Sequence, residues 1–204
     1  MGLFSAYLLR RRLRMVVPWL GRSILDIGCG SAALVERLSS GQSYTGVELR
    51  SEAIEVLQQR FPGHCFLRCD VDHSPLPDFS RKFDTVVMAA VIEHLEQPEK
   101  VMAACHCLLL SGGRVVLTTP SPAGMRVHRL AAALGLASRE ASREHKQCHG
   151  RAALDQLARS AGFVVVCYRR FLLGLNQLVV CERASAPVAA TGHSVGGREL
   201  HEAQ

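Results

Sequence analysis

The sequence predicts an α/β protein with a doubly wound, mostly parallel sheet of seven strands. Two observations support this prediction: short apolar runs alternate with helical patterns, and the first run ends in a glycine-rich turn. The last two runs are separated only by a short link through Leu172 to Gly174, which predicts an antiparallel hairpin at one edge of the sheet. The strands are expected at residues 23–27, 43–48, 64–69, 83–89, 113–119, 163–169 and 174–181.

Helical spacing of apolar residues marks the segments between these strands. Ser51 is a plausible N-cap and Pro98 fits a first helical turn, while Gly112 and Gly162 follow helices as stop signals. The helices are expected at roughly 31–39, 51–60, 98–110 and 151–161.

The length of 204 residues and the apolar content of 48% suit one well-cored domain. A basic helix is expected within residues 1–22, and the domain itself within 23–182. Residues 120–149, with a helix-compatible run from Val127 to Leu136, predict an insertion over the carboxyl edge of the sheet, where open sheets bind ligands. Residues 183–204 lack periodicity and are expected to form a disordered tail.

The net charge of +6 is distributed unevenly, because residues 1–22 hold five arginines and no acid. A solvated helix face is the simpler interpretation, and contact with phosphate or a membrane surface is the alternative. No apolar run reaches the length that crosses a bilayer, and no export signal is evident, so a soluble cytoplasmic protein is expected. The arginines that would make such a contact are Arg10, Arg11, Arg12 and Arg14.

Eight cysteines are present, and most of them lie inside apolar runs. No two are spaced as Cys-x-x-Cys, and a helix through Cys105 and Cys107 would direct the two thiols to different faces. Reduced, mostly buried thiols are therefore expected, without structural zinc.

The segment Asp26-Ile27-Gly28-Cys29-Gly30 is a strand end followed by a glycine turn. Glycines at this point let a ligand approach the backbone closely, because they carry no Cβ. The segment also loosely fits the dinucleotide fingerprint, with Glu48 about 20 residues further on. Asp26 argues against that cofactor, since its carboxylate would face a pyrophosphate of the same sign but would attract an ammonium and a sulfonium.

This segment resembles the first motif of the class I S-adenosylmethionine-dependent methyltransferases. Tyr44 to Glu48 resembles their second strand, whose terminal acid binds both ribose hydroxyls, and Arg68 to Val71 resembles the third-strand end that recognises adenine. Lys82 to Val87 and Leu109 to Thr119 resemble the fourth and fifth strands. The resemblance covers about residues 20–181. It implies a Rossmann-like fold with an antiparallel last strand, S-adenosyl-L-methionine as cofactor, no metal, and cofactor contacts from Asp26, Gly28, Cys29, Gly30, Glu48, Leu49, Asp70, Val71 and Met88.

Within that superfamily, Val91 to Leu95 and the Glu144-His145 pair look like the small-molecule group that contains the quinone-biosynthesis O-methyltransferases. The resemblance places Glu93 and His94 where the reacting methyl emerges, as candidate catalytic residues. A histidine can take a proton near neutral pH, although methyl transfer needs chiefly alignment of its reactants. His145 and His149 are either a cover for the acceptor pocket or ordinary loop histidines.

Two other functions are open at this point. A metal-dependent RNA 2'-O-methyltransferase similar to the small-RNA 3'-end family would use Glu93, His94 and a later histidine as ligands, but Ala90 stands where a further Glu is expected. A non-catalytic partner protein would keep only the fold. Such a scaffold would have no use for Glu48 at the ribose position.

Overall fold

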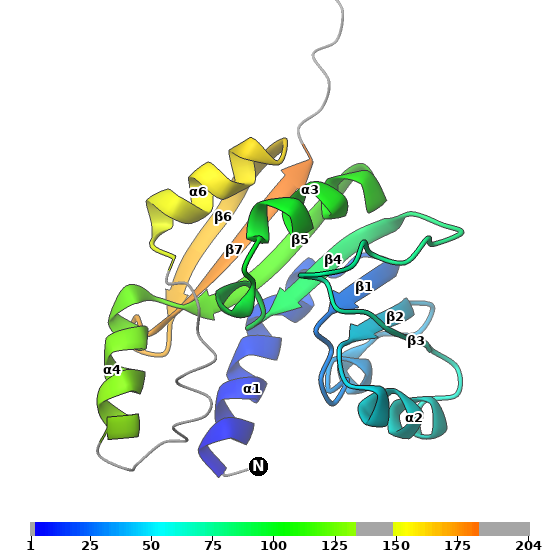
Figure 1. Ribbon diagram of the computed structural model, residues 1–204, viewed down its shortest axis with the longest axis horizontal. Coiled ribbons are helices and arrows are strands. Elements are labelled where there is room, and N and C mark those ends of the chain that lie inside the picture. Colours follow the sequence, from blue (N-terminus) through cyan, green and yellow to red (C-terminus); the bar gives the residue numbers. More distant parts are fainter. Residues whose placement is uncertain (1–2, 134–148, 184–204) are drawn as a thin grey trace, which may run out of the picture.

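The computed structural model describes residues 3–133 and 149–183, and these form one seven-stranded sheet in the order β3-β2-β1-β4-β5-β7-β6 (Figure 1). Strands β1 to β5 run parallel, and β7 runs antiparallel to both β5 and β6. The doubly wound sheet and its closing hairpin are thus confirmed. The strands are β1 Ser23–Ile27, β2 Ser43–Glu48, β3 Cys65–Arg68, β4 Phe83–Ala89, β5 Leu109–Pro120, β6 Phe163–Phe171 and β7 Asn176–Arg183.

Helices cover both faces of this sheet. One apolar core lies between the sheet and α3 and α6, and a second lies between the sheet and α1 and α2. Adjacent residues of β1 divide between them, with Ile24 in one core and Leu25 in the other, as strand alternation requires. The helices are α1 Leu3–Val16, α2 Ser51–Arg60, α3 Pro98–Leu108, α4 Pro122–Ala133 and α6 Arg151–Ser160, with the short 3₁₀ turns η1 Val17–Trp19, η2 Val35–Arg37 and η3 Ile92–His94.

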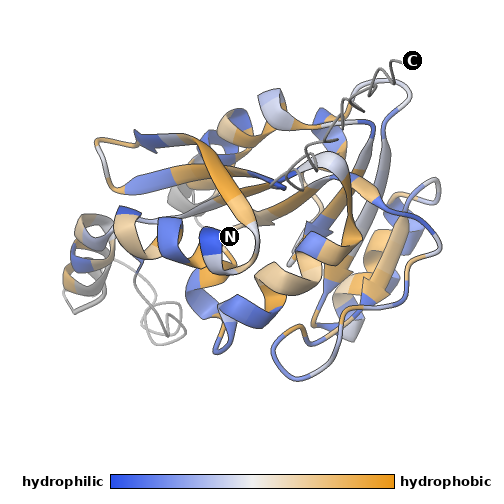
Figure 2. Cartoon of the chain, turned by 90° about the horizontal axis from the view of Figure 1, so that it is seen from above, coloured by the Kyte–Doolittle hydropathy of each residue, from blue (hydrophilic) through white to orange (hydrophobic). Residues whose placement is uncertain are grey.

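Figure 2 shows the apolar residues gathered in the strands, while the helices carry both apolar and polar residues. Val86, Val87 and Val116 are fully buried in the central strands β4 and β5. Burial of each such side chain contributes on the order of 1.5 to 3 kcal/mol, so the central strands form a rigid base for the loops at their ends.

The helix expected over residues 31–39 is wrong. Gly28, Gly30 and Ala32 have φ values of 68°, 57° and 51°, so these alternate residues lie outside the right-handed helical region and a regular helix cannot begin before residue 33. Gly41 has a φ of 83°, and the Ser39 amide donates to Gln42 Oε1 at 2.8 Å, which ends the segment. Only the single turn η2 fits between these two constraints.

Strand β5 begins earlier than the expected range of 113–119, and α3 correspondingly ends at Leu108. Leu109 pairs with Phe83, whereas Arg114 pairs with Thr85, so the double glycine Gly112-Gly113 lies in a bulge of β5. The glycines therefore act inside the strand and do not stop the helix.

The N-terminal helix α1 is packed against the domain, with Leu13 and Val16 in its core. Arg10 and Arg14 are exposed, as a solvated face requires. Arg12 is a correction to that expectation, because it is partly buried and its Nε donates to Asn176 Oδ1 at 3.3 Å. Arg11 is also partly buried, so the amphipathic helix leaves only Arg10 and Arg14 of these four arginines on its exposed face.

The segment 120–149, which the sequence predicts to be an insertion over the carboxyl edge, contains α4, and its residues 134–148 lie outside the described part of the chain. The tail at 184–204 lies outside it as well. In the described ranges, no helix has both the length and the apolar character needed to span a bilayer. Cys105 is buried and Cys107 is exposed, as predicted from their helical spacing, and the described cysteines are free thiols.

Candidate active site

A cavity of about 590 Å³ opens at the carboxyl ends of the parallel strands, a size that suits a small molecule. Its wall joins three successive strand ends through Gly28 after β1, Glu48 at the end of β2, and Asp70 after β3. The segment after β4 completes the wall with Val91 and His94. Leu49 and Val71, which the sequence also predicts at the site, line the same cavity.

Backbone hydrogen bonds join the glycine turn to β2. The amides of Gly28 and Cys29 donate to the Val47 carbonyl at 2.8 and 3.0 Å. Gly28 has a φ of 68°, and a Cβ at this position would lie 2.6 Å from Val91 Cγ2. The turn therefore needs glycine for its conformation and for the close approach of Val91.

Glu48 is the most enclosed acid of the cavity wall, with a side chain 9% exposed. Its Oε2 accepts a hydrogen bond of 2.9 Å from the Gly30 amide, and its Oε1 accepts one of 3.1 Å from Arg50 Nε. An ionised carboxylate has about four acceptor positions, so both oxygens can accept further hydrogen bonds from a ligand. The carboxylate is thereby held in place as an acceptor for hydroxyl groups.

Asp70 lies at the rim, where its two oxygens accept hydrogen bonds from the Asp72 amide at 3.2 Å and from His73 Nδ1 at 3.1 Å. The hydrogen bond from His73 lowers the pKa of Asp70, so this carboxylate stays ionised at neutral pH. Asp72 Oδ1 in turn accepts from the Glu96 amide at 2.9 Å. That bond joins the loop after β3 to the segment after η3.

Asp26 is placed beneath the glycine turn and not on the cavity wall. The Tyr44 hydroxyl donates to Asp26 Oδ2 at 2.7 Å. Burial raises the pKa of Asp26 to about 7, and the charge of Glu48 adds to the rise. Cys29 and Met88 are likewise buried away from the wall, and Gly30 reaches the site only through its bond to Glu48.

Glu93 and His94 share the turn η3 but face different surroundings. His94 lines the cavity, whereas Glu93 is 1% exposed and is buried behind it. Burial raises the pKa of Glu93, and the charge of Arg12 opposes this rise. The Thr119 hydroxyl also favours the ionised form, but its geometry falls short of a hydrogen bond. Glu93 therefore has no direct access to a ligand in this arrangement.

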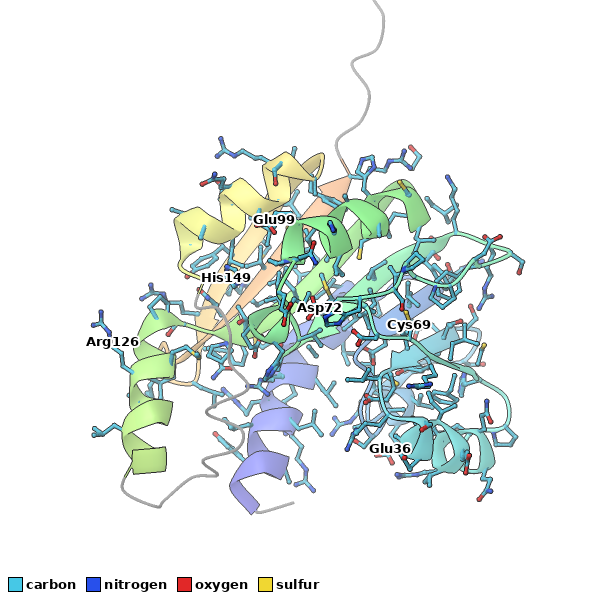
Figure 3. All side chains as sticks on the ribbon, viewed as in Figure 1. Glu36, Cys69, Asp72, Glu99, Arg126 and His149 are labelled. Atoms are coloured by element: carbon cyan, nitrogen blue, oxygen red, sulfur yellow. The ribbon has the colours of Figure 1, made fainter. Side chains whose placement is uncertain are left out.

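His149 does not line the cavity, and in Figure 3 it lies to the left of Asp72 and Cys69. Its carbonyl accepts a hydrogen bond of 2.6 Å from Gln177 Nε2, and burial lowers the pKa of its imidazole. His145 lies outside the described residues. Among those residues, His, Cys, Asp and Glu side chains form no group of three that could hold a metal ion.

Sequence reasoning missed several residues that shape this site. Asp72 and His73 directly follow a predicted strand end, which is a signal that could have found them. Tyr44 could also have been predicted, because the register of the parallel strands β1 and β2 places the side chains of Tyr44 and Asp26 on the same face of the sheet. Arg12 gave no such signal, since it lies in a run of similar arginines.

Comparisons with known proteins find similarity to methyltransferases. Residues 25–117 match a family model described as a methyltransferase domain. The ubiquinone biosynthesis O-methyltransferase of Aromatoleum aromaticum is 32% identical over 107 residues, which are 48% of this chain and 44% of that protein. The enzyme of the same name from Pseudomonas aeruginosa is 33% identical over 103 residues. The chain thus matches less than half the length of these curated relatives.

Solved structures extend the likeness across the fold. Magnesium protoporphyrin IX methyltransferase from Synechocystis, solved with bound SAH, matches with a TM-score of 0.69 and 16% identity over 90% of this chain and 89% of its own. A putative methyltransferase solved with the Trm112 activator of Haloferax volcanii has a TM-score of 0.67 and 14% identity, covering 91% of this chain and 99% of that one. These likenesses confirm the Rossmann-like methyltransferase fold.

Proposed function

We propose, from the premise that this chain carries a class I methyltransferase domain, that it transfers the methyl group of S-adenosyl-L-methionine to a small-molecule acceptor. The acceptor atom is an oxygen, nitrogen or carbon, which places the activity in the class EC 2.1.1.-. The observation that carries the proposal is the meeting of Gly28, Glu48 and Asp70 around one cavity at three successive strand ends.

The residues of the cavity fit this cofactor. Glu48 is held by Gly30 and Arg50 with acceptor capacity to spare, which suits two adjacent ribose hydroxyls. Asp70 is an ionised acceptor at the rim, followed by Val71, and together they suit the edge of an adenine ring. Gly28 carries no Cβ, so a ligand can approach the backbone closely at this position.

When bound, S-adenosyl-L-methionine supplies a methyl group on a positively charged sulfur. The task of this chain is then to orient two molecules and to exclude water, because alignment provides most of the rate in such a transfer. Glu48 and Asp70 orient the nucleoside, and His94 faces the cavity from the segment after β4. His94 is placed either to hold the acceptor or to take its proton.

The acceptor is assigned here only as a small molecule. The curated relatives are named for ubiquinone biosynthesis, but the region they share with this chain is 48% of it. The family match ends at residue 117, before α4 and the rest of the predicted insertion. The matched region therefore supports the cofactor assignment more than any particular acceptor.

Titration of the full chain with S-adenosyl-L-methionine and with S-adenosylhomocysteine tests the first half of the proposal. We expect saturable binding that is weakened in Glu48→Ala and kept in Glu52→Ala, where the replaced glutamate is exposed on α2. The second half is tested by a transfer screen with labelled cofactor over quinones, sugars, lipids, peptides and structured RNA. Absence of cofactor binding would favour a scaffold, and transfer to RNA alone would overturn the small-molecule assignment.

A further inference from the structure

The loop after β3 folds back so that His73 contacts Asp70 at the rim of the cavity. The amides of His73 and Ser74 donate to the Asp70 carbonyl at 3.3 and 2.8 Å, which forms a tight turn. This turn brings His73 Nδ1 to 3.1 Å from Asp70 Oδ2. The other carboxylate oxygen, Oδ1, accepts a hydrogen bond of 3.2 Å from the Asp72 amide. Both carboxylate oxygens of Asp70 are therefore held by donors of its own turn.

A second segment restrains the other side of the His73 ring. Asp72 Oδ1 accepts hydrogen bonds from the amides of Glu96 and Gln97 at 2.9 and 3.4 Å, so the turn is joined to the segment after η3. His73 Nε2 lies 3.9 Å from Glu96 Oε2. The imidazole is thus placed between two carboxylates that belong to different segments of the chain. This arrangement restricts the rotation of a side chain that is otherwise 62% exposed.

The anchored carboxylate of Asp70 faces the cavity that His73 also lines. An ionised carboxylate has about four acceptor positions, so Asp70 can still accept hydrogen bonds from a ligand. Because two donors of the turn hold its two oxygens, the direction of the remaining positions is fixed as well. The 6-amino group of adenine is a hydrogen-bond donor, whereas the 6-oxo group of hypoxanthine at the same place is an acceptor. A carboxylate aimed at this group therefore distinguishes the two bases.

We propose that His73 is a positioning residue for base recognition: its hydrogen bond to Oδ2 aims the Asp70 carboxylate at the 6-amino group, so that the chain selects adenine over bases with an oxygen there. The selection of the base rests on the proposed function, because it assumes that the cavity takes the nucleoside of S-adenosyl-L-methionine. The orientation of Asp70 by His73 does not depend on that assumption.

Two replacements of His73 separate its hydrogen bond from the presence of its ring. His73→Ala removes the donor, whereas His73→Asn keeps an N–H donor on a short side chain. Ser74→Ala is the matched control, since it changes an exposed side chain of the same turn and keeps the amide that donates to Asp70. Calorimetric titration of each full-length variant uses two ligands, S-adenosylhomocysteine and S-inosylhomocysteine, in which a 6-oxo group replaces the 6-amino group.

We expect His73→Ala to bind S-adenosylhomocysteine about tenfold more weakly than the wild type, because the acceptor for the 6-amino group is no longer aimed at it. Its affinity for S-inosylhomocysteine should not fall, so the ratio of the two affinities drops about tenfold. His73→Asn and Ser74→Ala should keep the wild-type ratio. A merely structural role of His73 would weaken both ligands equally. Equal losses in His73→Ala would therefore overturn the proposal, as would an unchanged ratio or a failure of His73→Asn to restore it.

The titration of Asp70, followed by NMR of its carboxyl carbon, gives a readout that needs no ligand. The hydrogen bond from His73 is the largest cause that lowers the pKa of Asp70, so this pKa should rise toward its ordinary value in His73→Ala and stay low in His73→Asn. An Asp70 pKa that is the same in His73→Ala and the wild type would overturn the positioning role. If the wild-type chain bound neither ligand, the proposed function itself would fail, and the titration would still decide whether His73 holds Asp70.

Discussion

The Tyr44 hydroxyl and the Asp26 carboxylate form a 2.7 Å hydrogen bond beneath the glycine turn, away from solvent. This bond favours the ionised acid, yet burial outweighs it and raises the pKa of Asp26 to about 7. Asp26 is predicted to contact the cofactor, and in this structure its carboxylate is buried beside Tyr44 and does not line the cavity. Its protonation is therefore linked to stability.

Asp26→Asn is expected to stabilise the protein increasingly as pH rises. The pKa of Asp26 is about 7 in the folded state and 3.8 in the unfolded state, so between these pH values the folded state keeps a proton that the unfolded state has lost. Wild-type stability is therefore fully present below about pH 4 and is lost as pH rises through 7. The neutral amide of the variant avoids this loss, so its free energy of unfolding at pH 8 should exceed that of the wild type by on the order of 2 to 4 kcal/mol. Urea unfolding at pH 4.5 and pH 8 measures the difference. Asp78→Asn, at an exposed position, should show no such trend, and a gain for Asp26→Asn that is the same at both pH values would contradict the raised pKa.

Glu48→Ala is expected to weaken binding of S-adenosyl-L-methionine by about 2 to 3 kcal/mol, because two hydroxyls would lose a charged acceptor in a sheltered cleft. Calorimetric titration measures the loss, with Glu52→Ala as the control. The fold should survive, since the hydrogen bonds of the Glu48 side chain go to the loop residues Gly30 and Arg50 among the described residues. A folded Glu48→Ala variant with unchanged affinity would remove Glu48 from the site.

Gly28→Val is expected to abolish cofactor binding. The φ of 68° disfavours a β-branched residue, and its Cβ would lie 2.6 Å from Val91 Cγ2, so Val91 would be pushed into the cavity. Circular dichroism should remain near that of the wild type, because the change is confined to a loop. Gly63→Ala is the matched control, since nothing lies within 4 Å of a Cβ there. Tight binding by Gly28→Val would mean that the glycine turn is only architectural.

The sequence predicts the parts of the fold in which local pattern and tertiary packing agree. Helix α2 occupies 51–60 as expected, because its apolar positions, Ile54 and Leu57 among them, face the core with helical spacing. The prediction of a helix over residues 31–39 fails because the positive φ values at Gly30 and Ala32 are backbone properties that composition does not reveal. The prediction that Arg12 is exposed fails for another reason, since its hydrogen-bond partner Asn176 is distant in the sequence. The strand-end acids Glu48 and Asp70 could be found because parallel strands bring their carboxyl ends to one edge.

Alkylation of the thiols should divide the cysteines by burial. Cys65 and Cys107 are exposed and are expected to react readily with iodoacetamide in the native protein. Burial raises the pKa of both Cys105 and Cys181 to about 12, so these thiols should react only after unfolding. Peptide mass mapping before and after denaturation measures the pattern. Rapid native labelling of Cys105 would show that α3 does not pack on the sheet as described.

We expect the reaction itself to need no metal and to depend mostly on the positioning of its two reactants. As the sulfonium becomes a neutral thioether, charge disperses, and a dry cleft favours that change without a Lewis acid. Two features of the chain motivate the prediction: Ala90 stands where the metal-dependent pattern needs a carboxylate, and Glu93 is buried and does not line the cavity.

His94→Ala should then lower turnover by a factor of roughly 10 to 10⁴ if the imidazole takes the proton of the acceptor. It should leave cofactor affinity nearly unchanged, because the nucleoside is held from the β2 and β3 side by Glu48 and Asp70. A fall in affinity that matches the fall in turnover would instead make His94 a binding residue. Activity after exhaustive chelation decides the metal question, because full loss, followed by recovery when a divalent ion is restored, would show that η3 supplies metal ligands and would favour RNA as the acceptor.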